Sequence, residues 1–260
     1  MKKLIVANWK MNPVTLDEAR SLFFTVEHRM HMIHHSVDVV VCPPALYLAP
    51  FSHYAHLVKL GGQNMSVADS GAYTGDISLT QMLQWGVEYV VLGHSERRLY
   101  FNETDSAVNS KIVLALKHKV HPVVCLGGEP GAKKSDMKKL VTKQFNASIK
   151  GLQRGDIHKL VFAYEPIWAI STMKNSKPAT GEHAAELIGH IRALISKKLG
   201  KDRGMHSRVL YGGTVNKSNV HEFSKFATID GALVGGASLD SESFWEIVKE
   251  FGRESIHKNQ

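Results

Sequence analysis

The chain has only two cysteines in 260 residues, Cys42 and Cys125. Two isolated cysteines make no disulfide framework, so we expect two buried, reduced thiols. Long hydrophobic runs are also missing, because no apolar stretch approaches the roughly 18 residues of a membrane span. The apolar stretch that follows Lys3 ends after four residues. A signal peptide needs an apolar region of about 7–15 residues. These absences predict a cytosolic protein with no membrane partner.

No linker rich in proline, glycine or serine divides the chain, so we expect one domain over residues 1–260. Apolar residues make up 43% of the sequence and charged residues 22%, which permits a sizeable core and excludes global disorder.

The net charge of +8 could attract nucleic acid, acidic lipid or an anionic metabolite. The densest lysines fall mostly along one expected helix and are not interleaved with aromatic residues: Lys133, Lys134, Lys138, Lys139 and Lys143. A groove for single-stranded nucleic acid needs such aromatics. The pattern therefore predicts a solvated outer helix face and no nucleic-acid partner.

Strand-like runs rich in Val, Ile and Leu alternate with segments of helical length along the whole chain. They lie near residues 4–8, 37–42, 58–63, 89–93, 121–126, 159–164, 207–211 and 231–234. Parallel strands covered on both faces have this continuous apolar character. A doubly wound open sheet usually carries G-x-G-x-x-G after its first strand, and that motif is absent. The order of elements predicts an α/β fold, a closed (β/α)8 barrel.

A histidine and a glutamate stand at the carboxyl ends of two of these expected strands. His94 follows the run that ends at Leu92, and Glu165 follows the run that ends at Tyr164. The carboxyl end is the catalytic face of a parallel barrel, so both side chains can reach one small molecule. An imidazole and a carboxylate base suffice to move a proton next to a carbonyl.

Glycine pairs and a lysine accompany this pair at other strand ends. Gly212-Gly213 precedes Thr214 after the seventh strand, and Gly235-Gly236 follows the eighth. Backbone N–H groups at such glycines can approach a phosphate closely, although either pair could also serve only a tight turn. Lys10 follows the first strand and can place a fixed positive charge in the barrel mouth.

Taken together, these segments resemble the triosephosphate isomerase family, whose fold is the TIM barrel. The matching motifs are collinear and lie at residues 8–12, 63–64, 71–76, 93–98, 101–105, 163–169, 211–213 and 230–239. The resemblance implies interconversion of dihydroxyacetone phosphate and glyceraldehyde 3-phosphate without cofactor or metal. It implies Glu165 as base, neutral His94 as electrophile and Lys10 as stabiliser of enediolate charge.

The resemblance also implies substrate-binding and subunit contacts. Phosphate would be held at Ser171, Thr214, Gly235 and Gly236, with Asn8 and Lys10 lining the pocket. Thr74, on the third loop, would dock into a second copy of the chain, so we expect a homodimer.

Two of the departures from the family lie in the lid and in the loop after the fifth strand. The family's Gly-Thr-Gly-Lys lid is Ser171-Thr172-Met173-Lys174 here, so we expect slower or less complete lid closure. Converting Ser171 and Met173 to glycine should then raise turnover or reduce phosphate elimination. After the fifth strand, Gly128 is an additional glycine between Gly127 and Glu129.

Three alternatives remain open at the level of sequence. The first is isomerisation of a four-carbon phosphosugar, and the second is a catalytically impaired barrel that binds phosphate or serves in adhesion. The third is a surface metal at His28, His31, His34 and His35, for which no carboxylate completes the set; a solvated, histidine-rich helix end is favoured.

Overall fold

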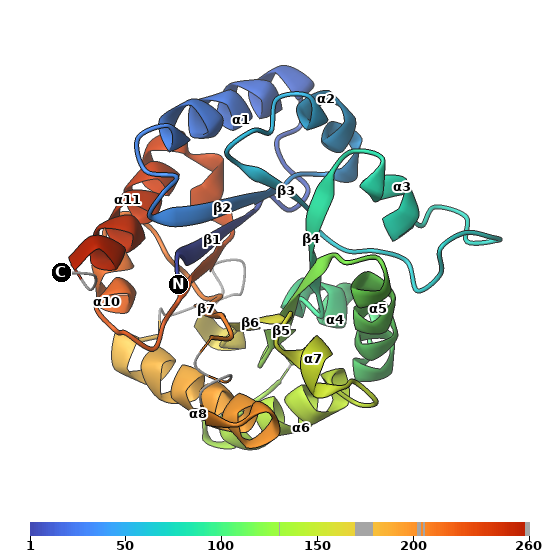
Figure 1. Cartoon of the computed structure of the whole chain (residues 1–260), viewed down its shortest axis with the longest axis vertical. Coiled ribbons are helices and arrows are strands. Elements are labelled where there is room, and N and C mark those ends of the chain that lie inside the picture. The colour runs from blue at the N-terminus through green and yellow to red at the C-terminus, as the bar shows by residue number, and fades with distance from the viewer. Residues whose placement is uncertain (130, 170–178, 202–203, 205, 258–260) are drawn as a thin grey trace.

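The computed structural model describes residues 1–129, 131–169, 179–201, 204 and 206–257. Eight parallel strands close into a barrel in sequence order, with helices around the outside (Figure 1). The strands are β1 (Lys3–Asn8), β2 (Val37–Cys42), β3 (Lys59–Gly62), β4 (Val87–Leu92), β5 (His121–Leu126), β6 (Val161–Tyr164), β7 (Val209–Tyr211) and β8 (Gly231–Val234). The predicted (β/α)8 fold is confirmed.

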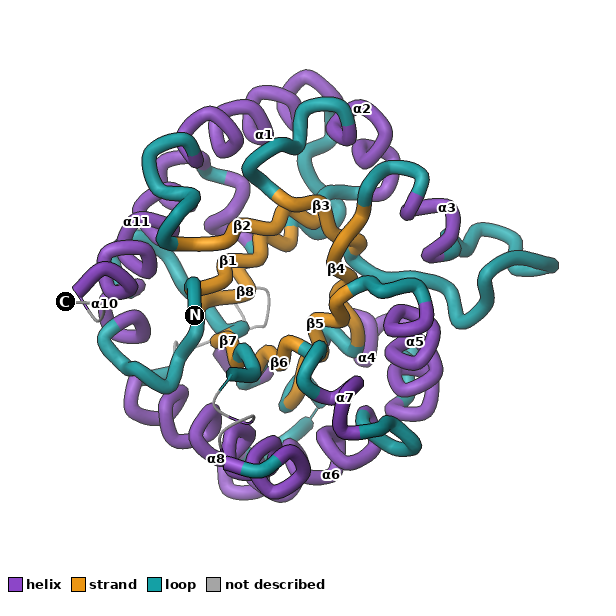
Figure 2. The backbone as a smooth tube through the Cα atoms, in the orientation of Figure 1, coloured by secondary structure: helices purple, strands orange, loops and turns teal. Residues whose placement is uncertain are grey.

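Helices follow the strands and form the outer ring, as the tube in Figure 2 shows. The α-helices are α1 (Leu16–Met30), α2 (Leu48–Ser52), α3 (Leu79–Leu83), α4 (Ser95–Phe101), α5 (Asp105–Lys117), α6 (Met137–Ser148), α7 (Arg154–Ile157), α8 (Gly181–Leu199), α10 (Val220–Ser224) and α11 (Ser241–His257). Short 3₁₀ helices are η1 (Ala45–Tyr47), η2 (Lys134–Asp136), η3 (Ile167–Ala169) and η4 (Gly236–Leu239).

The barrel closes where β1 pairs with β8, with Leu4 opposite Gly231. Gly231 has a φ of +149°, and a Cβ built there would lie only 1.8 Å from the carbonyl oxygen of Leu4. Only glycine fits at this contact, because a side chain would push the two strands apart.

Alternate residues of each strand supply two apolar layers, since neighbouring side chains point to opposite faces of a sheet. In β1, Leu4 and Val6 belong to a cluster inside the barrel, and Ile5 belongs to the larger cluster that includes the helix faces. Both faces of the strands are thus buried, which explains their continuous hydrophobic runs.

Hydrogen-bonding side chains fix where several helices begin. Thr15, Ser78, Thr104 and Thr180 are N-caps, each accepting a backbone N–H from three residues further along. Such a cap satisfies one of the free N–H groups of the first turn.

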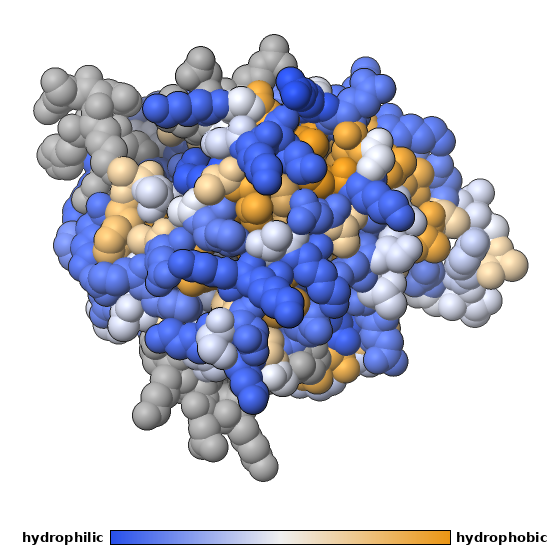
Figure 3. All heavy atoms as spheres, turned by 90° about the horizontal axis from the view of Figure 1, so that it is seen from below, coloured by the Kyte–Doolittle hydropathy of each residue, from blue (hydrophilic) through white to orange (hydrophobic). Residues whose placement is uncertain are grey.

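The five lysines expected on an outer helix face are all exposed, as predicted. They are Lys133, Lys134 of η2, and Lys138, Lys139 and Lys143 of α6. The face seen in Figure 3 is largely hydrophilic, with smaller apolar patches between the charged side chains. Among the described residues, no helix has the length and apolar character needed to cross a bilayer. Cys42 and Cys125 are buried free thiols, also as predicted.

Candidate active site

His94 stands between β4 and α4 and is the N-cap residue of that helix. Its Nδ1 atom accepts a hydrogen bond from the backbone N–H of Glu96 at 3.3 Å. A ring nitrogen that accepts must be unprotonated, so the geometry assigns the neutral imidazole with its proton on Nε2. The start of α4 directly after His94 therefore selects both the charge and the tautomer of the ring.

Glu165 directly follows β6, and its side chain is 1% exposed. Its Oε1 atom lies 3.2 Å from Nε2 of His94, and its Oε2 accepts the backbone N–H of Ser95 at 2.9 Å. Ser95 is the first residue of α4, where free N–H groups and the helix dipole favour a negative charge. The start of α4 thus holds the imidazole and the carboxylate together.

Lys10 brings a cation to the same helix. Its Nζ atom donates to Oε1 of Glu96 at 2.6 Å, and its backbone N–H donates to Oδ1 of Asn8 at 3.1 Å. Lys10 has a φ of 56°, in the left-handed region. This conformation costs a residue with a side chain about 1–2 kcal/mol. Gln63 supports the turn, because its Nε2 donates to the carbonyl oxygen of Lys10 at 2.7 Å. Backbone strain of this kind is concentrated at functional sites.

One cavity at the carboxyl end of the barrel collects most of the predicted side chains. It is lined by Asn8, Lys10, His94, Glu165, Gly212, Gly213, Leu233 and Gly235. Thr214 lies in the loop after β7 and Gly236 begins η4 after β8, and neither lines the cavity. Ser171, and the lid substitutions at residues 171–174, lie outside the described residues.

The structure shows why these positions around the cavity are glycine, which the sequence did not reveal. A Cβ at Gly212 would lie 2.9 Å from Cγ of Glu165, and one at Gly213 would lie 2.1 Å from the hydroxyl of Tyr211. The additional glycine after β5 is similar, because a Cβ at Gly128 would lie 3.1 Å from Oε2 of Glu165. These glycines make room for the Glu165 side chain and its surroundings.

Three supporting residues were not assigned roles from the sequence: Ser95, Glu96 and Gln63. Each lies inside a motif that matches the family, so the signal was the motif itself. Their contact partners lie far away in the sequence; for example, Ser95 contacts Glu165. Sequence spacing does not reveal such contacts.

The described residues contain no group of three or more histidine, cysteine or acidic side chains that could hold a metal ion. The histidines near the end of α1 instead form ring pairs, with centroids 6.2 Å apart for His28 and His31 and 5.7 Å apart for His34 and His35.

A buried carboxylate, a neutral imidazole and a fixed ammonium therefore meet at the catalytic face of a (β/α)8 barrel. This arrangement defines a class of enzyme that moves protons beside a carbonyl.

Comparison with known proteins identifies the family within this class of enzyme. The family model described as triosephosphate isomerase matches residues 3–251. Named triosephosphate isomerases from Alkaliphilus oremlandii and Caldanaerobacter subterraneus are 42% and 43% identical to the chain, each over 95% of it and 98% of the relative. That of Dictyoglomus thermophilum is 39% identical over 95% of the chain and 99% of the relative. The chain belongs to the triosephosphate isomerase family.

Proposed function

We propose that this chain interconverts dihydroxyacetone phosphate and D-glyceraldehyde 3-phosphate, with Glu165 as the base, His94 as the electrophile and Lys10 as a stabilising cation. The observation that carries the proposal is the 3.2 Å approach of Glu165 Oε1 to His94 Nε2 beside Lys10. Membership of the family supports the same reaction and favours a three-carbon substrate over a four-carbon one or a catalytically impaired barrel.

The reaction balances within the substrate. The Glu165 carboxylate takes a proton from C1 of dihydroxyacetone phosphate, and the C–H electron pair becomes the C1–C2 double bond as the carbonyl electrons move onto O2. The Nε2–H group of His94 donates to that oxygen, and Lys10 lowers the energy of its negative charge. A proton then passes from O1 to O2, and Glu165 returns its proton to C2. No external electron acceptor is needed, so the proposed reaction uses no cofactor.

Neutral His94 suits this role because its Nε2–H group can donate to the substrate oxygen. Once Nε2 has given up its proton, it can accept one again within the same turnover. In the resting enzyme, Nε2 lies 3.2 Å from Oε1 of Glu165. The substrate would take the place of this contact, with C1 facing the carboxylate and O2 facing the ring.

For the phosphate, we propose backbone groups at Ser171, Thr214, Gly235 and Gly236, with Asn8 and Lys10 beside them. A Cβ at Gly235 would lie 3.1 Å from Cε of Lys10. The absence of a side chain at Gly235 therefore lets backbone and ammonium approach one anion together.

The test is the steady-state rate of dihydroxyacetone phosphate isomerisation by wild type, Glu165→Asp and His94→Gln. Each substitution should lower kcat by at least about 10²-fold, the contribution of a positioned acid–base group. Glu88→Asp and His158→Gln change the same residue types at exposed positions and should keep the wild-type rate. Wild-type rates in the first two variants, with the fold intact, would overturn the assigned roles.

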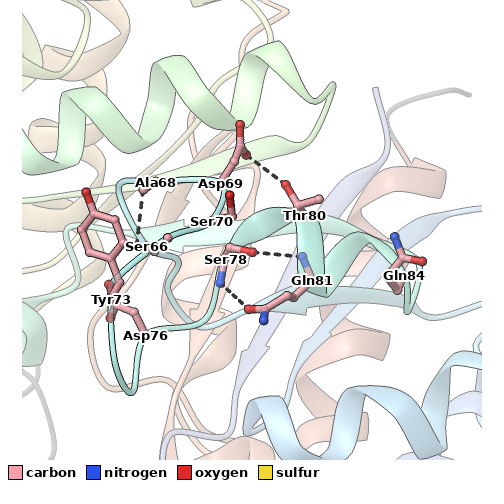
Figure 4. A pocket seen from close by; sticks show the side chains of 11 residues that line it. Ser66, Ala68, Asp69, Ser70, Tyr73, Asp76, Ser78, Thr80, Gln81 and Gln84 are labelled. Carbon is pink, nitrogen blue, oxygen red and sulfur yellow. Dashed lines mark hydrogen bonds between the residues drawn. The ribbon is translucent and has the colours of Figure 1, made fainter.

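We also propose that the working unit is a homodimer. The loop between β3 and α3 extends beyond the helix ring (Figure 1), and Thr74 lies in it, exposed. The base of this loop is anchored, because Asp69 Oδ1 accepts from Thr80 Oγ1 at 3.0 Å and lies 2.8 Å from His118 Nε2. Figure 4 shows the hollow beneath the loop, lined by Asp69, Tyr73 and Ser78 among others. A protruding loop whose base is held by hydrogen bonds is suited to insertion into a partner subunit.

Exposed apolar side chains around the same end of the barrel support the dimer. Met11 is 91% exposed and Val14 is 85% exposed on the loop that follows β1, and Leu46, in η1 after β2, is 85% exposed. Large apolar side chains gathered at one surface are typical of an interface. Sedimentation should give twice the chain mass for wild type, and Thr74→Arg should give a monomer. Val113→Arg, on the exposed face of α5, is the control. A monomeric wild type would contradict the dimer.

We place the enzyme in the cytosol, with a small triose phosphate as ligand and neither nucleic acid nor membrane as partner. The two buried, unpaired thiols suit a reducing compartment.

A further inference from the structure

His183 contacts residues on both sides of Glu165. The histidine lies in the first turn of α8, where its backbone N–H donates to the capping Thr180 hydroxyl at 3.3 Å. Its Nε2 atom lies 3.0 Å from the hydroxyl of Tyr164, the residue before Glu165. Its ring centroid lies 5.6 Å from that of Trp168, three residues after Glu165, with a tilt of 53°.

We infer that His183 is a positioning residue for the base: it fixes Tyr164 and Trp168 against α8 and so holds the segment that carries Glu165. This inference rests on the proposed role of Glu165. The backbone of the segment is already held by the sheet, since Glu165 donates to the Leu126 carbonyl and Gly212 donates to the Tyr164 carbonyl, both at 2.8 Å. His183 adds a side-chain clamp from outside the barrel.

The protonation states of the two side chains limit the direction of the hydrogen bond. Tyr164 is fully buried, and burial raises the pKa of its hydroxyl well above its usual range, so the group keeps its proton. Burial, and then the charge of Lys134, lower the pKa of His183, so its ring is neutral at neutral pH. A protonated phenol can therefore donate to Nε2 of a neutral ring whose own proton lies on Nδ1. A buried hydroxyl without this acceptor would lose a hydrogen bond that it needs.

Other charged groups near His183 lie on three elements. Lys134 of η2 opposes a positive charge on the ring, and Glu186 of α8 favours it. Glu186 is itself paired with Lys138 of α6 at 2.7 Å. Because this pairing offsets the charge of Glu186, the neutral ring is maintained.

The test compares His183→Ala, His183→Gln and Tyr164→Phe with a matched control on the same helix. His190→Ala removes a similar bond, because Nε2 of His190 lies 2.8 Å from the Thr142 hydroxyl on α6, away from β6. His183→Ala should lower kcat about tenfold with little change in KM, since a misplaced catalytic group slows the chemical step. His183→Gln, whose amide can reach the Tyr164 hydroxyl, should retain most of the kcat that His183→Ala loses. His190→Ala should leave kcat unchanged.

A double-mutant cycle separates positioning from general destabilisation. If His183 acts through the hydroxyl, then His183→Ala combined with Tyr164→Phe should be no slower than the slower single variant. Additive losses, equal kcat for His183→Ala and His190→Ala, or no rescue by glutamine would overturn the inference. Failure of the proposed function is distinguishable, because it would appear as inactive wild type or active Glu165→Asp.

Discussion

Replacement of Gly128 by alanine tests how tightly the loop after β5 is packed against the proposed base. A Cβ at this position would lie 2.6 Å from Cβ and 3.0 Å from Cα of Ser95, and 3.1 Å from Oε2 of Glu165. Ser95 donates the backbone N–H that holds the same Oε2 atom. One added methyl group would therefore press on both members of that hydrogen bond.

The size of the effect follows from these distances. Carbon atoms pack best at roughly 3.5–4.0 Å, so a contact of 2.6 Å requires a displacement of about 1 Å. Part of that contact is with backbone, which cannot rotate away. Overpacking of this kind costs about 1–3 kcal/mol of folding free energy. A misplacement of about 1 Å at a reacting group can cost about 10²-fold in rate, so we expect kcat of Gly128→Ala to fall by about 10–100-fold.

The assay is isomerisation of dihydroxyacetone phosphate, measured beside thermal unfolding. Gly189→Ala is the matched control: a Cβ there meets nothing within 4 Å, and its position inside α8 favours alanine by up to about 1 kcal/mol. The control should keep kcat and gain stability. Wild-type kcat and unfolding temperature in Gly128→Ala would refute the packing argument.

Three further predictions concern ionisable side chains. Glu27 accepts three backbone N–H groups of residues 56–58 at 2.9–3.2 Å, so Glu27→Gln should cost about 2 kcal/mol and lower Tm measurably by calorimetry. Lys10→Met leaves the enediolate charge unstabilised and should lower kcat/KM by about 10²–10³-fold in the isomerase assay. The pKa of His183 lies below its ordinary 6.5 in the folded chain, so the unfolded chain binds more protons just below that pH. Stability should therefore fall as pH decreases through this window, and His183→Gln should show a smaller loss of Tm between about pH 7.5 and about pH 5.

The strands were predictable because parallel strands buried on both faces give uninterrupted apolar runs. Their exact bounds were not. The seventh run was expected over residues 207–211, yet β7 begins at Val209, whose backbone N–H donates to the Asp230 carboxylate at 2.8 Å. The side chain of the residue that precedes β8 thus takes the place of a sheet partner. Contacts between residues distant in sequence determine where such strands begin.

The proposed catalytic side chains were also predictable, because each stands where a strand ends and lies in a family motif. The supporting contacts were not, since nothing near Gly128 in the sequence reveals Ser95 or Glu165 as its neighbours. The additional glycine looked like a local irregularity after β5. In the fold it occupies the space beside the proposed base, where a larger residue would not fit.

The origin of the hydrogen at C2 of the product tests the central proposal most directly. Dihydroxyacetone phosphate is converted in D₂O, and deuterium at C2 of glyceraldehyde 3-phosphate is measured by NMR. A carboxylate that carries the proton can exchange it with solvent, so wild type should produce C2-deuterated product, and Glu165→Gln should produce almost none because turnover is lost. Normal turnover by Glu165→Gln would contradict proton transfer by Glu165, and product that retains only the substrate hydrogen would contradict a carrier that exchanges its proton with solvent.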